Sequence, residues 1–343
     1  MLLYALAALL LPLSSIRVEA SCACSPVVIP VHVNVLVPKD PTDPFAGLKS
    51  NASELRRVED TYDLLVHGFS YTSQYWSPPV EEFRNYSYTA FSCAQGPYSS
   101  LAVDVLGAGL SSRPANSSDV QFPTAYALLS QLARLLKSTN FILPGAQTFK
   151  TIIGFGHSAG SGLLTFGSIV DGKNSPFDAL VLTSFLATLN ISTLPTLTSA
   201  RDVDPLRWAS LDPGYLSRGD HSIFYPTDPT SFSSRMVLLD DLVGDVGSVS
   251  LVSQASTAAL MSGYTGAVAK IVGSADQIIC VGNGGCEDVT ALTAAEGALW
   301  PAVKSFEFIV SQGSGHDMNL DFFADRTFDT FVRLVKKFSD FET

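Results

Sequence analysis

The sequence predicts an α/β fold, with a mostly parallel central sheet flanked by helices and an inserted helical cap. Short apolar runs typical of strands alternate with longer stretches of helical periodicity over most of the chain. Strands that are separated by helices need crossover connections, and such connections favour parallel pairing. The alternation is interrupted between about residues 185 and 262, where proline, aspartate and aromatic residues gather without a clear strand. We therefore expect one domain over residues 21–343, with the cap inserted in that interval.

The expected strands are short runs of mostly apolar residues. The first alternates in polarity, as in a strand with one solvated face, whereas the others are typical of strands buried on both faces of a parallel sheet. They cover Val31–Val37, Tyr62–Val66, Leu101–Asp104, Phe149–Phe155, Ala179–Thr183, Ala267–Val272 and Phe306–Val310.

Three helices have clear signals. Leucines between Leu128 and Leu136 recur at helical spacing, and Pro144-Gly145 ends that helix. A second helix begins at about Gly160, directly after a strand. The third lies near the end of the chain, where the segment from Phe328 to Phe338 carries apolar residues on one face.

Composition limits the kinds of partner. Of the 343 residues, 46% are hydrophobic and 15% are charged, which excludes a disordered tail, a coiled coil and a collagen-like repeat. The formal net charge is −11, whereas nucleic acids and anionic membranes attract lysine and arginine. We therefore expect neither of them as a partner, and the sequence shows no sign of a protein partner.

The first 20 residues have the features of a secretory signal peptide. Leu2–Leu13 is an apolar run that is too short to span a bilayer, and Val18-Glu19-Ala20 is a small-x-small pattern suited to cleavage. We expect cleavage after Ala20 and secretion; an uncleaved anchor or a buried first helix is the alternative. No later apolar run reaches about 18 residues, so no membrane span is expected in the mature chain.

Two kinds of extracellular modification are expected. Cys280 and Cys286 bracket a glycine-rich loop that can turn back on itself, so we expect them to form a disulfide. Cys93 is expected to pair with Cys22 or Cys24, which leaves one cysteine over. Metal binding is the weaker alternative, because no histidine or cysteine cluster has the spacing of metal ligands. Sequons for N-glycosylation occur at Asn51, Asn85, Asn116 and Asn190.

The strongest chemical signal is the segment Gly156-His157-Ser158-Ala159-Gly160, between an apolar strand and a helix. A serine on a sharp strand-to-helix turn adopts strained backbone angles, so glycines two residues before and after it relieve clashes and let a substrate approach. The turn also directs the positive end of the helix at the serine and makes the N–H of Ala159 available to an oxyanion. This pattern predicts that Ser158 is a nucleophile; an ordinary glycine-rich loop is the alternative.

In its strand–turn–helix context the motif resembles the nucleophile elbow of the α/β-hydrolase superfamily, and the resemblance covers most of residues 25–340. The superfamily's order of nucleophile, acid and histidine implies that Asp276, at a strand end, is the acid and that His316, after the last expected strand, is the base. His67 is the rival for the base. The rivals for the acid are Asp288, Asp240 and Asp241.

Three further segments carry the resemblance. His67-Gly68-Phe69 is similar to the superfamily's His-Gly-x turn, which implies an oxyanion hole made by the N–H groups of Phe69 and Ala159. An ordinary glycine turn at a strand end is the alternative. The loop Asp104–Pro114 is similar to a structural turn of the same superfamily, and the cap stretch from Trp208 to Tyr225 is similar to that of secreted fungal and bacterial hydrolases.

The resemblance implies a secreted serine hydrolase that cleaves a carboxylic ester, lactone or thioester through an acyl-enzyme, without a cofactor or a metal. A small apolar substrate is expected because the cap is rich in aromatic and aliphatic residues, although these also form a cap's own core. One alternative is a hydrolase or cyclase that tailors a polyketide lactone or epoxide, although epoxide-opening members usually carry Asp at the elbow. The other is a catalytically silent binding module on the same fold.

Overall fold

The computed structural model describes residues 61–95, 98–138, 148–187, 196–254, 262–281 and 285–340. Some of the sequence-based expectations concern other residues and stay predictions. Outside the described residues lie the signal peptide 1–20, the strand Val31–Val37, the sequons at Asn51 and Asn190, Pro144-Gly145, and the cysteines Cys22 and Cys24.

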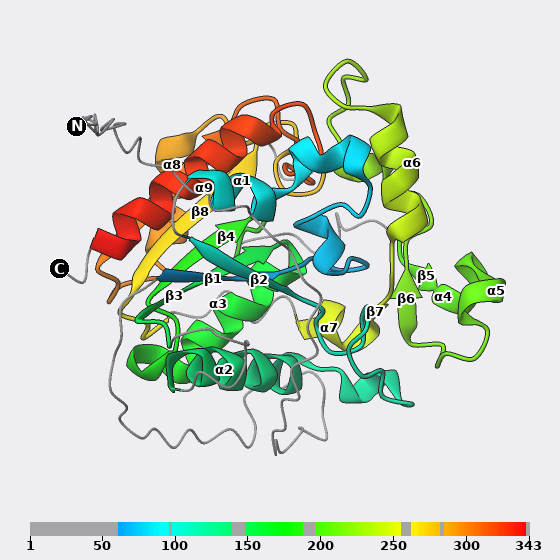
Figure 1. Ribbon diagram of the computed structural model, residues 1–343, viewed down its shortest axis with the longest axis horizontal. Helices are drawn as coiled ribbons and strands as arrows, with labels where there is room; N and C mark the ends of the chain where they lie inside the picture. Colours follow the sequence, from blue (N-terminus) through cyan, green and yellow to red (C-terminus); the bar gives the residue numbers. More distant parts are fainter. Residues whose placement is uncertain are drawn as a thin grey trace, which may run out of the picture.

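Six strands form the central sheet, in the order β2-β1-β3-β4-β8-β9 (Figure 1). Every neighbouring pair is parallel, as the crossover argument predicts. Each strand expected from Tyr62 onward is present, with its ends within two residues of the expected positions. The strands are β1 (Thr61–Val66), β2 (Ser99–Val103), β3 (Thr151–His157), β4 (Ala179–Thr183), β8 (Ala267–Gly273) and β9 (Ser305–Ser311).

Helices cover both faces of this sheet. In Figure 1, α1 and α9 lie on one side of the strands and α2 and α3 on the other. Phe331 of α9 packs against Phe155 of β3, with ring centroids 5.5 Å apart. No helix in the described part of the chain is both long and apolar enough to cross a membrane. The main helices are α1 (Tyr88–Gln95), α2 (Phe122–Ser138), α3 (Ala159–Asp171), α8 (Val289–Gly297) and α9 (Ala324–Ser339). Short 3-10 helices cover Ser73–Tyr75, Glu81–Tyr86, Ser117–Asp119, Gly172–Asn174 and Ser222–Phe224.

The cap, in which the sequence indicates no clear strand, contains a small sheet as well as the expected helices. Its three strands pair antiparallel in the order β5-β6-β7 and lie to the right of the central sheet in Figure 1. Strands of two or three residues are too short to show the period-two pattern that marks a strand in a sequence. The elements are β5 (Thr198–Ser199), α4 (Ala200–Val203), α5 (Pro205–Trp208), β6 (Tyr215–Ser217), α6 (Ser234–Val243), β7 (Gly247–Ser248) and α7 (Val249–Gln254).

An ion pair holds the cap against the loop that follows β2. Nη2 of Arg113 lies 2.6 Å from Oδ1 and 2.7 Å from Oδ2 of Asp245, which precedes β7. The same carboxylate accepts the N–H of Gly109 at 2.9 Å. The backbone N–H of Asp245 donates to the carbonyl of Ser70 at 2.8 Å. The cap is therefore fixed to the segments that follow β1 and β2, at the carboxyl edge of the sheet.

The expected disulfide between Cys280 and Cys286 is confirmed, with their Cα atoms 5.1 Å apart. It closes the loop between β8 and α8. Cys93, in α1, is also disulfide-bonded. The sequons at Asn85 and Asn116 both present exposed asparagines, so their side chains are accessible to modification.

A carboxyl group is buried on a strand of the central sheet. Asp63 of β1 is fully buried, and it accepts a hydrogen bond from the hydroxyl of Tyr88 at 3.0 Å through Oδ2. Its Oδ1 has no hydrogen-bond partner among the described residues. Burial raises the pKa of Asp63 to about 7, although the bond from Tyr88 opposes the shift. The folded protein therefore holds this proton more tightly than the unfolded chain does.

We expect Asp63→Asn to stabilise the protein at pH 8 and to change its stability little at pH 4. The stability linked to the Asp63 proton is fully present below the unfolded pKa, near 4, and is lost as pH rises to about 7, by up to about 1.4 kcal/mol per unit. Asparagine keeps an acceptor for Tyr88 and does not ionise. The measurement is denaturant unfolding of both proteins at the two pH values. Asp321, whose pKa burial also raises to about 7, is present in both proteins, so its contribution cancels in the difference between their stabilities. An equal stability difference at both pH values would contradict this account of Asp63.

Candidate active site

Ser158 lies on the sharp turn between β3 and α3. Its φ of 49° is in the left-handed region, a costly conformation for a residue with a side chain. The N–H of Ser158 donates to the carbonyl of Thr183 at 2.9 Å, which fixes the turn to β4. The glycines around it are required by close approach. A Cβ at Gly156 would lie 2.6 Å from the backbone of Ser161, and one at Gly160 would lie 2.5 Å from the carbonyl oxygen of Val66.

The structure brings Ser158, His316 and Asp276 together, although 118 and 40 residues separate them in sequence (276 − 158 and 316 − 276). Nε2 of His316 lies 2.9 Å from Oγ of Ser158, and Nδ1 lies 2.8 Å from Oδ2 of Asp276. Oδ1 of Asp276 accepts the N–H groups of Ile278 and Ile279 at 2.9 and 2.8 Å. The acid is fully buried and the histidine nearly so. The three side chains thus form one hydrogen-bonded chain that ends at the serine hydroxyl.

The alternative candidates for the base and the acid make other hydrogen bonds. His67 donates from Nδ1 to the carbonyl of Gly68 at 2.8 Å, and its Nε2 accepts the N–H of Val105 at 2.9 Å. Both ring nitrogens are therefore used to hold the loops after β1 and β2. Burial also lowers the pKa of His67, which agrees with a neutral ring. Asp288 caps α8 by accepting the N–H of Ala291, while Asp240 and Asp241 bond to other residues of the cap and of the loop after β1.

The expected oxyanion loop passes close to the nucleophile. A Cβ at Gly68 would lie 2.9 Å from Cδ2 of His157 and 3.2 Å from Cβ of Ser158, so a larger residue here would require the ring of His157 to shift. Phe69 follows directly, and Ala159 is the first residue of α3, where backbone N–H groups are free of helix partners. Phe69, Ala159 and Gly68 line the same pocket.

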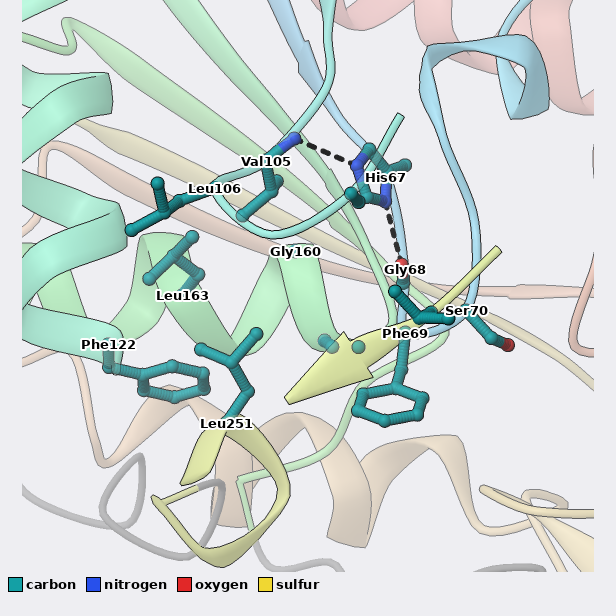
Figure 2. Close-up of a pocket in the computed structure, with 14 residues that line it drawn as sticks. His67, Gly68, Phe69, Ser70, Val105, Leu106, Phe122, Gly160, Leu163 and Leu251 are labelled. Carbon is teal, nitrogen blue, oxygen red and sulfur yellow. Dashed lines mark hydrogen bonds between the residues drawn. The ribbon is translucent and has the colours of Figure 1, made fainter. Parts of the chain in front are cut away.

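That pocket is mostly apolar (Figure 2). The empty space within it is about 370 Å³, part of which is open solvent, so the enclosed part of the pocket is small. None of its described lining residues is Asp, Glu, Lys or Arg. The apolar side chains labelled in Figure 2 come from the loops after β1 and β2 and from α2, α3 and α7; they include Phe69, Leu106, Phe122, Leu163 and Leu251.

Neither this pocket nor a hydrogen bond that holds the backbone of His316 was predicted from the sequence. Leu163 stands one helical turn beyond Ala159, so its place near the site could have been inferred from the elbow, but Phe122 and Leu251 carry no such signal. Ser184, directly after β4, has a φ of 52° and donates its hydroxyl to the carbonyl of His316 at 2.6 Å. No group of three or more potential metal ligands is found in the described part of the chain.

The sheet order, the elbow and the Ser–His–Asp chain define a hydrolase of the α/β type. The model of the alpha/beta hydrolase family matches residues 64–330. Because this match spans most of the sequence, the chain belongs to the alpha/beta hydrolase family and is a hydrolase enzyme.

Solved structures of the same fold come from bacteria and plants. An esterase from Thermogutta terrifontis is 14% identical, with 82% of this chain and 91% of that chain covered and a TM-score of 0.53. The methylesterase MES16 from Arabidopsis is 14% identical, with 81% and 99% covered and a TM-score of 0.51. The epoxide hydrolase VrEH1 from Vigna radiata is 15% identical, with 82% and 93% covered and a TM-score of 0.51. At such identities the likeness shows the fold alone. No curated protein matches the chain.

Proposed function

We propose that the protein is a serine hydrolase that cleaves an uncharged carboxylic ester, lactone or thioester through an acyl-enzyme on Ser158. The observation that carries this proposal is that His316 hydrogen-bonds Ser158 and Asp276 at the same time, at 2.9 and 2.8 Å. A base must reach the hydroxyl that it deprotonates, and a second group must orient the base. A silent binding module would not need this continuous chain, which argues against that alternative.

The reaction follows from the geometry. Oγ of Ser158 attacks the carbonyl carbon while Nε2 of His316 takes the hydroxyl proton, and Asp276 holds the ring in the required tautomer and stabilises the imidazolium. The N–H groups of Phe69 and Ala159 are proposed to bind the oxyanion. His316 then gives its proton to the leaving alcohol or thiol. In the second half, His316 activates a water molecule that hydrolyses the acyl-enzyme and releases Ser158.

The pocket beside Phe69 and Ala159 favours an apolar, uncharged group of small size. An ionised group in this lining would lose its hydration without gaining a charged partner. We therefore propose that a short acyl or alcohol group of the substrate occupies it. Ester and lactone substrates fit this site equally well, so tailoring of a lactone is a special case of the same chemistry.

Secretion is proposed on three grounds. Residues 1–20 have the pattern of a cleavable signal. Cys280 and Cys286 form a disulfide, which persists in oxidising compartments. The asparagines of two sequons, Asn85 and Asn116, are exposed.

The direct test combines labelling by a fluorophosphonate probe with hydrolysis of nitrophenyl esters from acetyl to palmitoyl. We expect the wild-type protein to be labelled and to prefer the short acyl chains, because the pocket is small. Ser158→Ala should show neither labelling nor hydrolysis above the background. Ser112→Ala is the matched control, since Ser112 is an exposed serine outside the site. Absence of labelling in folded wild-type protein, or labelling that survives Ser158→Ala, would overturn the proposal.

A further inference from the structure

A buried polar cluster lies behind His316 and joins the core to the cap. Its centre is Asp317, whose side chain is fully buried. Oδ1 of Asp317 lies 3.2 Å from Nε2 of His157, and Oδ2 is hydrogen-bonded to the hydroxyl of Tyr71. The same hydroxyl lies 3.0 Å from Oδ2 of Asp240, on the cap helix α6. Nothing in the proposed reaction uses this cluster.

The hydrogen bonds around His157 determine where its proton lies. The hydroxyl of Thr183 donates to the carbonyl of Gly156 at 3.0 Å, so its oxygen is left to accept a bond from Nδ1 of His157, 3.3 Å away. Burial, together with His316 and His67, lowers the pKa of His157 well below its ordinary value, so the ring carries one proton. With that proton on Nδ1, Nε2 is an acceptor. The group that faces Nε2 is the carboxyl of Asp317, which must then supply the proton of this bond.

The charges around Asp317 favour the same protonation state. Asp240 faces it from α6 and Asp276 from the turn after β8, so an ionised Asp317 would be a third buried anion. Burial and these two carboxylates raise the pKa of Asp317 well above its ordinary value. The hydroxyl of Tyr71 keeps its proton, since burial raises its own pKa well above its ordinary value, and its hydrogen bond to Asp317 opposes the rise in the pKa of Asp317.

Two more ionisable side chains, those of Tyr75 and His221, lie against the cluster. Tyr75, whose pKa burial also raises well above 10, stacks on the ring of His157 with centroids 4.0 Å apart. On the cap side, Nδ1 of His221 lies 3.4 Å from Oδ1 of Asp240. Burial opposes the charged form of His221, yet Asp240 and Asp241 together raise its pKa. His221 thus pairs with Asp240 and not with Asp317, so it supplies no cation to Asp317.

The cluster is in contact with the reacting histidine. Asp317 follows His316 in the chain, and its backbone N–H donates to the carbonyl of Phe224 in the cap at 2.9 Å. The ring of His316 contacts those of His157 and Phe224, at centroid distances of 5.2 and 5.3 Å. Asp317 is thus bonded to both of these residues, to His157 through its side chain and to Phe224 through its backbone N–H.

We propose that Asp317 is a neutral positioning residue, which donates a hydrogen bond from its carboxyl to Nε2 of His157, accepts one from Tyr71, and so holds the His316 loop against both the elbow and the cap. This inference rests on the proposed function. Ionisation of Asp317 removes the donor and places a third anion in the cluster. The alignment of His316 with Ser158 is then lost as pH rises through the pKa of Asp317.

The test uses three full-length variants with the same ester substrate. Asp317→Asn keeps a donor and an acceptor but does not ionise; Asp317→Leu removes both; Asp325→Asn is the control, because Asp325 is exposed on α9. Wild-type kcat should fall at alkaline pH. We expect Asp317→Asn to keep kcat within a few-fold of wild type at pH 7 and to lose the alkaline fall. Asp317→Leu should lower kcat about 100-fold with little change in KM, because the reacting groups are misaligned. Substitution of a residue with a purely structural role would not change the alkaline fall of kcat.

A second readout does not depend on activity. The infrared carbonyl band of a protonated carboxylic acid should be larger in wild type than in Asp317→Asn at pH 7, while Asp325→Asn should match wild type. Other buried acids are common to all variants and cancel in the difference. The proposal is overturned if this band is absent, if Asp317→Asn keeps the alkaline fall, or if it is as impaired as Asp317→Leu. Failure of the proposed function would appear differently, as wild-type protein that is not labelled at Ser158.

Discussion

Replacement of His316 by alanine is expected to lower kcat for ester hydrolysis by about 10⁴-fold or more, with a small change in KM. The reason is that Nε2 of His316, the proposed base, lies 2.9 Å from the hydroxyl of Ser158. Without the imidazole, the serine at neutral pH is a protonated alcohol and a poor nucleophile. Substrate binding depends on the pocket and the oxyanion loop, which do not include His316. Steady-state kinetics with a short-chain ester measures both parameters.

The double variant makes this prediction sharper. If Ser158 and His316 act as one unit, Ser158→Ala/His316→Ala should be about as slow as either single variant, because loss of one member already removes the function of the other. Asp276→Asn should also lose about 10⁴-fold, since an amide favours the wrong tautomer of His316 but still accepts the N–H groups of Ile278 and Ile279. Additive losses in the double variant, or near wild-type activity of His316→Ala, would show that the base is another residue.

The second large effect is expected on stability, and it concerns a buried ion pair. Lys270 of β8 and Glu296 of α8 are both fully buried, and Nζ of Lys270 is hydrogen-bonded to Oε2 of Glu296. Oε1 of Glu296 also accepts the N–H of Ala187 at 3.1 Å, just after β4, where the chain leaves the sheet for the cap. Burial lowers the pKa of Lys270, and Glu296 opposes that shift. Each charge therefore depends on the other for compensation.

We expect Lys270→Met to destabilise the protein by about 3–5 kcal/mol, because it leaves the carboxylate of Glu296 buried without its partner. The double variant Lys270→Met/Glu296→Gln should recover much of this loss, since glutamine is neutral and still accepts the N–H of Ala187. Denaturant unfolding of the wild type, Lys270→Met, Glu296→Gln and the double variant gives the free energies of unfolding and the coupling between the two positions.

Lys337→Met is the matched control for this cycle. Lys337 also pairs with a glutamate, Glu307, at 2.8 Å, but its side chain is 40% exposed. Loss of such a solvated pair should cost about 1 kcal/mol or less. Similar losses for Lys270→Met and Lys337→Met, or no recovery in the double variant, would be incompatible with a charge-compensated core.

The central sheet could be predicted because its signals are local. Buried parallel strands such as Ala179–Thr183 are continuous apolar runs, and the elbow around Ser158 is a motif whose glycines are required by contacts within a few residues and by the neighbouring strand. The disulfide between Cys280 and Cys286 is equally local. The strands of the cap were missed because two or three residues hold no periodicity, and β6 pairs with partners far away in sequence.

The sequence by itself determined the order of the parallel strands along the chain, the nucleophile turn and the candidate histidine and acid, because each depends on short-range pattern and steric need. Only the tertiary structure favours His316 over His67 as the proposed base, since that choice depends on which ring nitrogen faces Ser158. The apolar pocket, and the contacts of Asp317 on which the proposal of a neutral carboxyl rests, likewise appear only in the tertiary structure. These properties arise from distances and burial among residues of different strands and of the cap, and no local pattern encodes them.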